Sequence, residues 1–179
     1  MTERLANDAD RVGRTDRPEF TIREIRPGEM DALGELTVAA YRDAGETDED
    51  YYPELRAVAA RAAVVPVLVA TESGTGRILG GVTYVPGPGP YHEGEFGEAA
   101  AFRMLAVAPD ARGRGVGRAL VEAVIARARA EGRLAVCLFT RPFMTAAHRL
   151  YASLGFVRQP QHDWEFAPGE WLHGYLLEL

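Results

Sequence analysis

The first third of the chain changes from strand-like to helical hydrophobic patterning. The sequence FTIREI, residues 20–25, alternates apolar and polar positions, which predicts a half-buried strand that Pro27 and Gly28 end. Apolar residues then recur at helical spacing over residues 29–44 and, after an acidic link, over residues 50–65. The pattern therefore predicts one strand followed by two helices.

The middle of the chain is rich in strand-like runs. The runs PVLVATE, residues 66–72, and RILGGVTYV, residues 77–85, are joined by the turn-forming sequence SGTG, which predicts an antiparallel hairpin. The Gly-Gly pair at 80–81 is typical of a bulge. Residues 86–99 hold too many Gly and Pro residues for regular structure, and loops of this length are often functional. A strand, AFRMLAV, follows over residues 101–107.

The last third alternates helices and strands. Its helical segments show an apolar stripe or a proline in the first turn, and glycines follow their last turns. The predicted elements are a helix from Val116 to Gly132, a buried strand over residues 134–140, a helix from Pro142 to Leu154, a strand from Phe156 and a terminal strand over residues 171–179.

The order of these elements predicts an α/β (α+β) fold with a mixed sheet. The strand at residues 101–107, the helix after it and the strand at residues 134–140 form a β-α-β unit, whose strands should be parallel. The remaining strands follow one another closely enough to pair antiparallel. We therefore expect a mixed central sheet of about seven strands flanked by about four helices.

Composition is that of an ordinary globular protein. The 179 residues fit one domain, and contents of 47% hydrophobic and 26% charged residues exclude a disordered or fibrous chain. Residues 1–18 are polar and mixed in charge, so we expect a mobile leader before a single domain at residues 19–179. The sequence shows neither a run of about 18 apolar residues nor the apolar centre of a signal peptide, which makes a cytoplasmic location the default expectation.

Charge and residue usage narrow the range of functions. A net charge of −6 and a pI near 5.3 argue against general binding to nucleic acid or to an anionic membrane, so any anion site must be local. Cys137 is the only cysteine, which excludes an intrachain disulfide and a cysteine-based metal centre, and we expect no metal. All 20 basic residues are arginine, so the lysine of a P-loop and the lysine of a pyridoxal phosphate site are both absent.

The sequence RGRGVGR, residues 112–118, lies between the strand at residues 101–107 and the helix that follows it. Its three glycines let backbone N–H groups approach a ligand closely, and the helix N-terminus adds unpaired donors and partial positive charge. Arg112, Arg114 and Arg118 add positive charge within an acidic chain. This loop therefore predicts a binding site for a pyrophosphate.

Three phosphate-binding patterns compete for this loop, and two of them fit poorly. A dinucleotide fingerprint needs a third glycine at position 118, where this chain has arginine, and an acidic residue at the end of the next strand, which here ends in Thr140 and Arg141. A Walker loop needs a Lys-Ser or Lys-Thr pair, which is absent. The structural alternative is a glycine-rich turn whose arginines only solubilise a helix end.

The third pattern matches. Arg112-x-x-Gly115-x-Gly117 after LAVAP resembles the coenzyme A pyrophosphate loop of the Gcn5-related N-acetyltransferases, and AAHRLYASLGF, residues 146–156, resembles the second signature of that family. The two segments occur in the order and spacing of the family, and the element order matches its fold from about residue 20 onward. The resemblance implies a three-layer sandwich that transfers an acetyl group from acetyl-CoA directly to a primary amine in a ternary complex.

The resemblance also assigns site residues. The resemblance implies that the pantetheine arm of the coenzyme adds like an extra strand to the edge opened where two parallel strands splay. Leu105 to Val107 would be its backbone partners, and a backbone N–H near Met104 or Leu105 would polarise the acetyl carbonyl. Tyr151 matches the family tyrosine that faces the sulfur and should protonate the leaving thiolate. Its helical spacing alone would equally fit a tyrosine that packs on the sheet. Met144 stands where the family often has asparagine, which removes that side-chain contact. The implied coenzyme contacts are Met104, Leu105, Ala106, Val107, Arg112, Gly113, Arg114, Gly115, Val116, Gly117, Arg118, Ala147 and Tyr151.

Four further residues have side chains that can take part in catalysis. Glu98, just before the strand at residues 101–107, is the best placed in sequence to act as general base, with Glu95 second; an ordered water or a merely solvated acid is the alternative. His148 is interpreted as a partly exposed helix residue that makes a local hydrogen bond rather than as a catalyst. Cys137 is interpreted as a buried small hydrophobic residue rather than as a covalent acetyl carrier.

The acceptor stays open. The acidic stretch over residues 43–52, with Asp43, Glu46, Asp48, Glu49 and Asp50, would attract a cationic small-molecule or peptide amine, although a solvated capping loop explains it as well. The sequence YHEGEFGE, residues 91–98, is a second candidate wall of the acceptor site. A longer acyl donor and a catalytically silent acyl-CoA-binding module are alternatives. Pairing of two copies through the terminal strands is allowed but not required.

Overall fold

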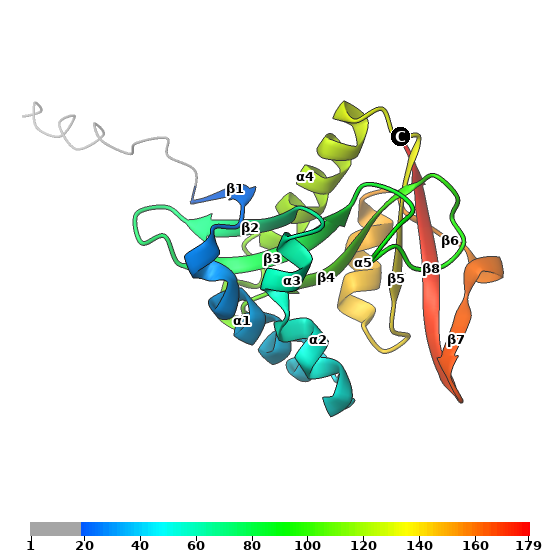
Figure 1. Cartoon of the computed structure of the whole chain (residues 1–179), viewed down its shortest axis with the longest axis horizontal. Helices are drawn as coiled ribbons and strands as arrows, with labels where there is room; N and C mark the ends of the chain where they lie inside the picture. Colours follow the sequence, from blue (N-terminus) through cyan, green and yellow to red (C-terminus); the bar gives the residue numbers. More distant parts are fainter. Residues whose placement is uncertain (1–18) are drawn as a thin grey trace, which may run out of the picture.

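The computed structural model describes residues 19–179, so the expectation for residues 1–18 lies outside the described residues (Figure 1). The strands are β1 (Phe20–Glu24), β2 (Val67–Glu72), β3 (Ile78–Val85), β4 (Ala100–Val107), β5 (Ala135–Thr140), β6 (Val157–Arg158), β7 (Trp164–Ala167) and β8 (Glu170–Glu178). The α-helices are α1 (Met30–Asp43), α2 (Tyr52–Arg56), α3 (Val58–Ala62), α4 (Val116–Ala130) and α5 (Thr145–Ser153). Within residues 19–179, no helix is both long and apolar enough to cross a membrane.

The fold is the expected mixed sheet between two helical layers. The strand order is β1-β2-β3-β4-β5-β8-β6, and β7 pairs with β8 as a hairpin beside it. β4 and β5 are parallel, as the β-α-β pattern predicts, and the other neighbours are antiparallel. Helices α1 to α3 cover one face and α4 and α5 the other (Figure 1). The sandwich prediction is confirmed, with eight strands rather than about seven in the described part of the chain.

The segment predicted as one helix over residues 50–65 is instead two short helices with a break at Ala57, which the buried Arg61 side chain stabilises. α2 ends at Arg56, and Ala57 leaves helical geometry with ψ of 48°. Arg61, whose residue surface is 2% exposed, donates to the backbone oxygens of Glu54 at 2.5 Å and Leu55 at 3.1 Å. Its guanidinium therefore satisfies carbonyls at the end of α2 that a continuous helix would pair internally.

Two further boundaries differ from the sequence-based expectation. α5 begins at Thr145 rather than at Pro142, because Met144 has ψ of 56° and its N–H bonds the Arg141 carbonyl in a turn. The segment before the last strand, expected as a loop, contains β7. β7 pairs with β8, the strand that follows it. The sequence of β7 alone shows no strand pattern.

The Gly-Gly pair in β3 does mark an irregular register. The pairing of β3 shifts next to both glycines, once against β2 and once against β4. A Cβ atom on Gly80 would stand 2.5 Å from the Ala106 carbonyl oxygen, and one on Gly81 would stand 2.6 Å from the Leu33 side chain. The absence of side chains therefore lets β4 and α1 approach β3 closely, next to the part of β4 that carries the candidate site.

Glu29 offers a test of acid stability at the start of α1. Its carboxylate bonds the guanidinium of Arg23 at 2.6 and 2.8 Å and accepts from the Arg26 N–H at 2.9 Å. The Arg23 bonds, partly opposed by burial, lower the pKa of Glu29 from 4.5 to about 2. The carboxylate therefore stabilises the fold above pH 4.5 and loses this effect as pH falls towards 2.

Replacing Glu29 by glutamine should lower the free energy of unfolding by about 1–2 kcal/mol at pH 7, and the difference should shrink below pH 4. Urea titrations of both proteins from pH 2.5 to 7 would measure it. The matched control is Glu35→Gln, since Glu35 is exposed and pairs with Arg56 at 2.7 Å on the surface, where about 0.5 kcal/mol or less is expected. Equal losses in the two variants would contradict the assignment.

Candidate active site

The two parallel strands at the centre of the sheet separate towards their carboxyl ends. β4 and β5 pair at only two positions, Ala100 with Val136 and Ala101 with Cys137. Beyond these pairs β4 follows β3 and β5 follows β8. The divergence opens the sheet between its two central strands, as the resemblance predicts for the pantetheine site.

A bulge lies in β4 at this opening. Arg103 stands opposite Thr83 and Ala106 opposite Gly81, so Met104 and Leu105 share one partner position on β3. Met104 has φ of 54°, which is uncommon for a residue with a side chain and typical of functional sites. The bulge redirects the backbone at Met104 and Leu105, where the sequence predicts an N–H that polarises the acetyl carbonyl.

The glycine-rich loop leads from β4 to α4. Gly113 and Gly115 have φ of 76° and 81°, and Gly115 is the N-cap residue of α4. No atom lies within 4 Å of the Cβ that either residue would carry. The backbone at these two positions therefore faces open space at a helix N-terminus, which is the geometry that a phosphate group requires.

The three arginines of the loop are engaged with neighbouring side chains. Arg112 pairs with Asp43, and Arg118 donates to the Ser153 hydroxyl at 2.7 Å. Arg114 pairs with two carboxylates, at 2.5 and 3.2 Å. A bound pyrophosphate would compete with these contacts, so the backbone N–H groups and the helix dipole are the fixed part of the site.

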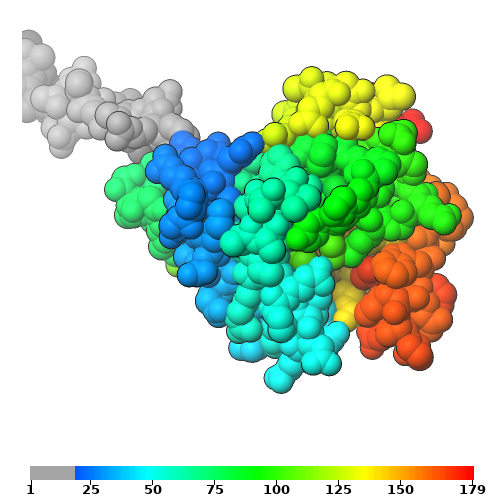
Figure 2. All heavy atoms as spheres, in the orientation of Figure 1, coloured from blue at the N-terminus to red at the C-terminus, as the bar shows by residue number. Residues whose placement is uncertain are grey.

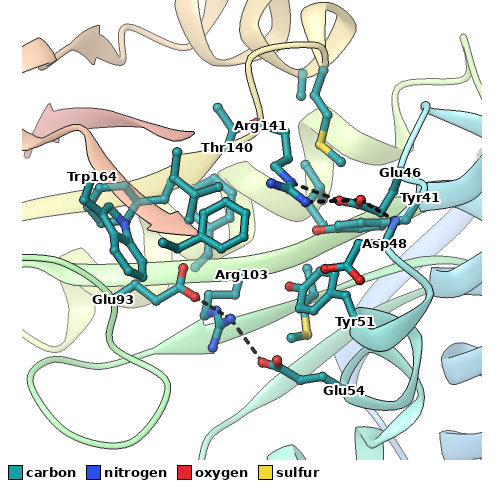
Figure 3. Close-up of a pocket in the computed structure, with 18 of the residues that line it drawn as sticks. Tyr41, Glu46, Asp48, Tyr51, Glu54, Glu93, Arg103, Thr140, Arg141 and Trp164 are labelled. Carbon is teal, nitrogen blue, oxygen red and sulfur yellow. Dashed lines mark hydrogen bonds and ion pairs between the residues drawn. The ribbon is translucent and has the colours of Figure 1, made fainter. Parts of the chain in front are cut away.

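A cavity of about 350 Å³ lies between the α1–α2 region and the β7–β8 hairpin, where the space-filling view is hollowed (Figures 2 and 3). Its walls come from α1 to α2, from the splayed strands, from α5 and from the hairpin. The lining residues are Tyr41, Glu46, Asp48, Asp50, Tyr51, Glu54, Glu93, Phe102, Arg103, Met104, Leu105, Phe139, Thr140, Arg141, Met144, Ala147, Tyr151, Trp164, Phe166 and Leu172. The cavity thus contains Tyr151, Ala147, Met104 and Leu105 from the predicted set.

Tyr151 is held rigidly at this cavity by aromatic packing. It lies on α5, its residue surface is 5% exposed, and its ring centroid lies 5.7 Å from that of Phe102 and 6.1 Å from that of Tyr175. Burial, and secondarily the nearby Tyr175, raise the pKa of Tyr151 well above its ordinary value. The phenol therefore stays protonated at neutral pH and is available as a proton donor.

Two arginines cross the cavity, each held between two carboxylates. Arg103 on β4 pairs with Glu93 at 2.5 Å and with Glu54 at 3.2 Å. Arg141, directly after β5, contacts Glu46 at 3.0 Å (Figure 3). It also pairs with Glu170 at 2.6 Å.

Asp48 and Asp50 also line the cavity, and within residues 19–179 neither pairs with an arginine. With Glu46, Glu54 and Glu93 they make five lining carboxylates against two guanidinium groups. The lining is therefore net negative, and the two acids without an arginine partner, Asp48 and Asp50, are exposed, so this charge favours the approach of a positively charged ligand from solvent.

Glu93 is a lining carboxylate whose side chain is 26% exposed and lies against Arg103. Burial raises the pKa of Glu93, while the charge of Arg103 opposes this and that of Glu54 adds to it. A carboxylate with a raised pKa inside a cavity is typical of a proton acceptor in catalysis.

The structure does not bring Glu98 or Glu95 to Tyr151. Both line a second hollow with Arg133 and His162, and Glu98 is exposed. Glu98 precedes the end of β4 that still pairs with β5, whereas the cavity opens at the splayed end. This placement gives no support to either residue as the base, although both lie in the same loop as Glu93.

The cavity also contains residues that the sequence-based analysis missed. Arg103 gave a usable signal, since it is a charged residue within the apolar strand AFRMLAV. Arg141, Trp164 and Phe166 gave none, because strand β5 and the β7–β8 hairpin meet only in the folded chain. Within residues 91–98, Glu93 reaches the cavity, whereas Phe96 packs against Phe139 and His162 behind its wall.

Cys137 and His148 have the structural roles expected of them. Cys137 is fully buried in β5, and burial raises the pKa of its thiol to about 12, so no thiolate is available as an acetyl carrier. A ring nitrogen of His148 lies 3.1 Å from the Arg141 carbonyl oxygen, which is a local hydrogen bond.

Comparison with known proteins agrees with this geometry. Residues 30–156 match the acetyltransferase (GNAT) family. A Gcn5-related N-acetyltransferase from Kribbella flavida is 28% identical and covers 90% of this chain and 98% of its own, with a TM-score of 0.66. YncA from Salmonella typhimurium, whose structure contains its cofactor acetyl-CoA, is 26% identical and covers 89% of this chain and 94% of its own, with a TM-score of 0.64.

A curated relative, the mycothiol acetyltransferase of Thermobispora bispora, is 44% identical over 66 residues. This match covers 37% of the present chain and 22% of the relative, so the chain spans about a fifth of that protein's length. The family match covers more than two thirds of the chain and confirms the resemblance seen in the glycine loop and in the segment around Tyr151. The chain belongs to the acetyltransferase (GNAT) family.

Proposed function

We propose that this protein transfers an acetyl group from acetyl-CoA to a primary amine in a ternary complex. Members of the GNAT family are acyl-CoA-dependent transferases. The observation that carries the proposal is the divergence of β4 and β5, because it opens the sheet at the end of β4 that leads to the glycine loop and beside the cavity lined by Tyr151. Burial of Cys137 argues for direct transfer, because the chain has no other thiol to carry the acetyl group.

The donor fits the residues that are present. The open backbone at Gly113 and Gly115 would take the pyrophosphate, and Met104 to Val107 would lie along the pantetheine arm. Met144 and Ala147, both of which line the cavity, would contact the arm from the side of α5. The thioester would then lie beside the bulge in β4 and beside Tyr151.

Each chemical step has a residue in this cavity. Glu93 takes one proton from the bound ammonium, and the neutral amine attacks the thioester carbonyl carbon to form the new C–N bond. A backbone N–H at Met104 or Leu105 stabilises the oxyanion. The C–S bond then breaks, and the Tyr151 hydroxyl gives its proton to the departing thiolate. The second proton of the acceptor nitrogen restores the tyrosine.

The acceptor is a cation, since five carboxylates and two arginines line the cavity. Four of the carboxylates, Glu46, Asp48, Asp50 and Glu54, come from the α1–α2 region, whereas Glu93 lies on the side of Trp164 (Figure 3). Trp164 and Phe166 supply aromatic rings from the hairpin. An amine with an apolar or aromatic body and no carboxylate suits both walls.

Release of free thiol from acetyl-CoA, followed over a panel of amines, tests the proposal. Phenethylamine should be acetylated with a higher kcat/KM than phenylalanine, which differs by an added carboxylate. Binding of acetyl-CoA without turnover on any amine would favour a silent binding module instead. Faster reaction with propionyl-CoA than with acetyl-CoA would identify a longer-chain transferase.

Replacing Glu93 by glutamine should lower kcat/KM for the amine by about 100-fold near neutral pH. Because the base must be ionised, the acid limb of the wild-type pH profile should lie above the ordinary glutamate pKa and should disappear in the variant. The difference in kcat/KM between Glu93→Gln and wild type should shrink as pH approaches the pKa of the amine, because more of the amine is then already neutral in solution.

Glu98→Gln is the matched control, since it changes another carboxylate of the same loop outside the cavity. Its rate should stay within about twofold of wild type. A larger loss in Glu98→Gln than in Glu93→Gln would return the role of base to Glu98.

A further inference from the structure

We propose that the hydroxyl group of Thr140 is a hydrogen-bond partner of the pantetheine arm of the donor and is not an internal structural contact. This inference rests on the proposed function. Thr140 is the last residue of β5, on the edge of the opening between the two splayed strands, and lines the cavity (Figure 3).

The hydroxyl of Thr140 is buried without a partner. The residue is 5% exposed, and its Oγ1 atom makes no hydrogen bond. The other side-chain atoms in this state within residues 19–179 are Nε atoms of three arginines, so Thr140 has the one such hydroxyl. A buried unpaired hydroxyl destabilises a fold and calls for an explanation, such as a ligand that completes its bonding.

The position of Thr140 along the strand places it on the donor side of the cavity. Side chains two residues apart share a face of a strand, so Thr140 shares the face of Leu138, which packs in the cluster that contains Tyr151. Phe139 faces the other way and contacts Phe96 and Trp164, on the side of the hairpin. Thr140 therefore lies with the residues proposed to face the thioester, not with those that line the acceptor wall.

The chemistry of the arm matches this hydroxyl. Pantetheine carries two amide groups and ends in the thioester, which together offer carbonyl acceptors and N–H donors. A threonine hydroxyl can donate one hydrogen bond and accept others, so it can pair with either kind of group. The bond would form only when the donor is bound, which explains why the hydroxyl has no partner within the protein.

The test is the nearly isosteric substitution Thr140→Val, measured in two ways. Calorimetric titration with coenzyme A should show affinity weakened about 5- to 10-fold. The melting temperature of the ligand-free protein should stay equal or rise, because an unpaired buried hydroxyl is replaced by a methyl group. Adenosine 3′,5′-bisphosphate, which lacks the arm, should bind both proteins equally.

Two variants serve as controls. Thr140→Ser keeps the hydroxyl and should bind coenzyme A within about twofold of wild type. Thr71 on β2 is as buried as Thr140, at 5% exposed, but its hydroxyl bonds that of Thr21 at 3.2 Å. Thr71→Val should therefore lower the melting temperature and leave coenzyme A affinity unchanged.

Unchanged coenzyme A affinity in Thr140→Val would overturn the inference, and so would an equal loss for the bisphosphate without the arm. A lower melting temperature of ligand-free Thr140→Val would show that the hydroxyl has an internal partner, which also overturns it. If the wild-type protein itself fails to bind coenzyme A, the proposed function fails instead.

Discussion

Replacing Tyr151 by phenylalanine should lower kcat by about 100- to 1000-fold and leave the affinity for acetyl-CoA within about threefold of wild type. The substitution removes only the hydroxyl, and the ring keeps its packing against Phe102, Phe156 and Tyr175. Without this proton the thiolate must leave as an anion in a buried site, which raises the barrier of the step that breaks the C–S bond. Steady-state kinetics with a saturating amine, together with calorimetric titration of coenzyme A, would separate the two effects.

The control for this prediction is Tyr175→Phe. Tyr175 is 9% exposed and lies next to Tyr151, but it is absent from the lining of the cavity. Its kcat should stay within about threefold of wild type. Since burial raises the pKa of Tyr151, wild-type activity should also persist to alkaline pH without an inflection near 10. A Tyr151→Phe variant with nearly wild-type kcat would show that the tyrosine only packs on the sheet.

The second large effect is expected at the glycine loop. Gly115→Val should weaken binding of coenzyme A by at least about 30-fold, because a branched side chain opposes φ of 81° and would occupy the proposed position of the pyrophosphate. Affinity for adenosine 3′,5′-bisphosphate should also fall, because this ligand keeps one of the two phosphates of the pyrophosphate. Calorimetric titration of both ligands measures the effect.

Gly132→Val separates ligand binding from backbone strain. Gly132, after the end of α4, has φ of 72° and, like Gly115, no atom within 4 Å of the added Cβ. Both variants should lose about 1–2 kcal/mol of stability from the left-handed backbone conformation, but only Gly115→Val should lose coenzyme affinity. Retention of tight binding by Gly115→Val would remove the loop from the proposed site.

Much of the fold was predictable because its signals are local. The alternation at residues 20–25, the glycines of the β2–β3 turn and the apolar stripe of α4 each depend on residues a few positions apart. The helix expected over residues 50–65 breaks at Ala57, and Arg61 bonds carbonyls six and seven residues earlier, at the end of α2. Hydrophobic periodicity does not reveal such side-chain bonds to the backbone. β7 was missed because its only partner is β8.

The candidate site likewise has one part that local sequence motifs predict and another that depends on tertiary contacts. The coenzyme loop and Tyr151 belong to two contiguous motifs, so their spacing along the chain was enough to propose them. The predicted contacts at Met104, Leu105, Ala147 and Tyr151 converge on one cavity, whereas their roles await the experiments above. The sequence could not choose a candidate base, since Glu93, Glu95 and Glu98 share one loop. The structure distinguishes Glu93, which lines the cavity and pairs with Arg103, from Glu95 and Glu98, which line a second hollow.

By itself, the sequence determined the layered fold, the glycine loop at the start of α4 and the family. These features depend on hydrophobic periodicity and on short motifs, and both involve residues that lie close together in the sequence. Only the tertiary structure decided which acids line the cavity, where Arg103 and Arg141 lie, and that the hydroxyl of Thr140 lacks a partner within the described residues. Those properties arise where strands distant in sequence diverge and a hairpin closes over them, because burial and charge pairing depend on every segment that meets there.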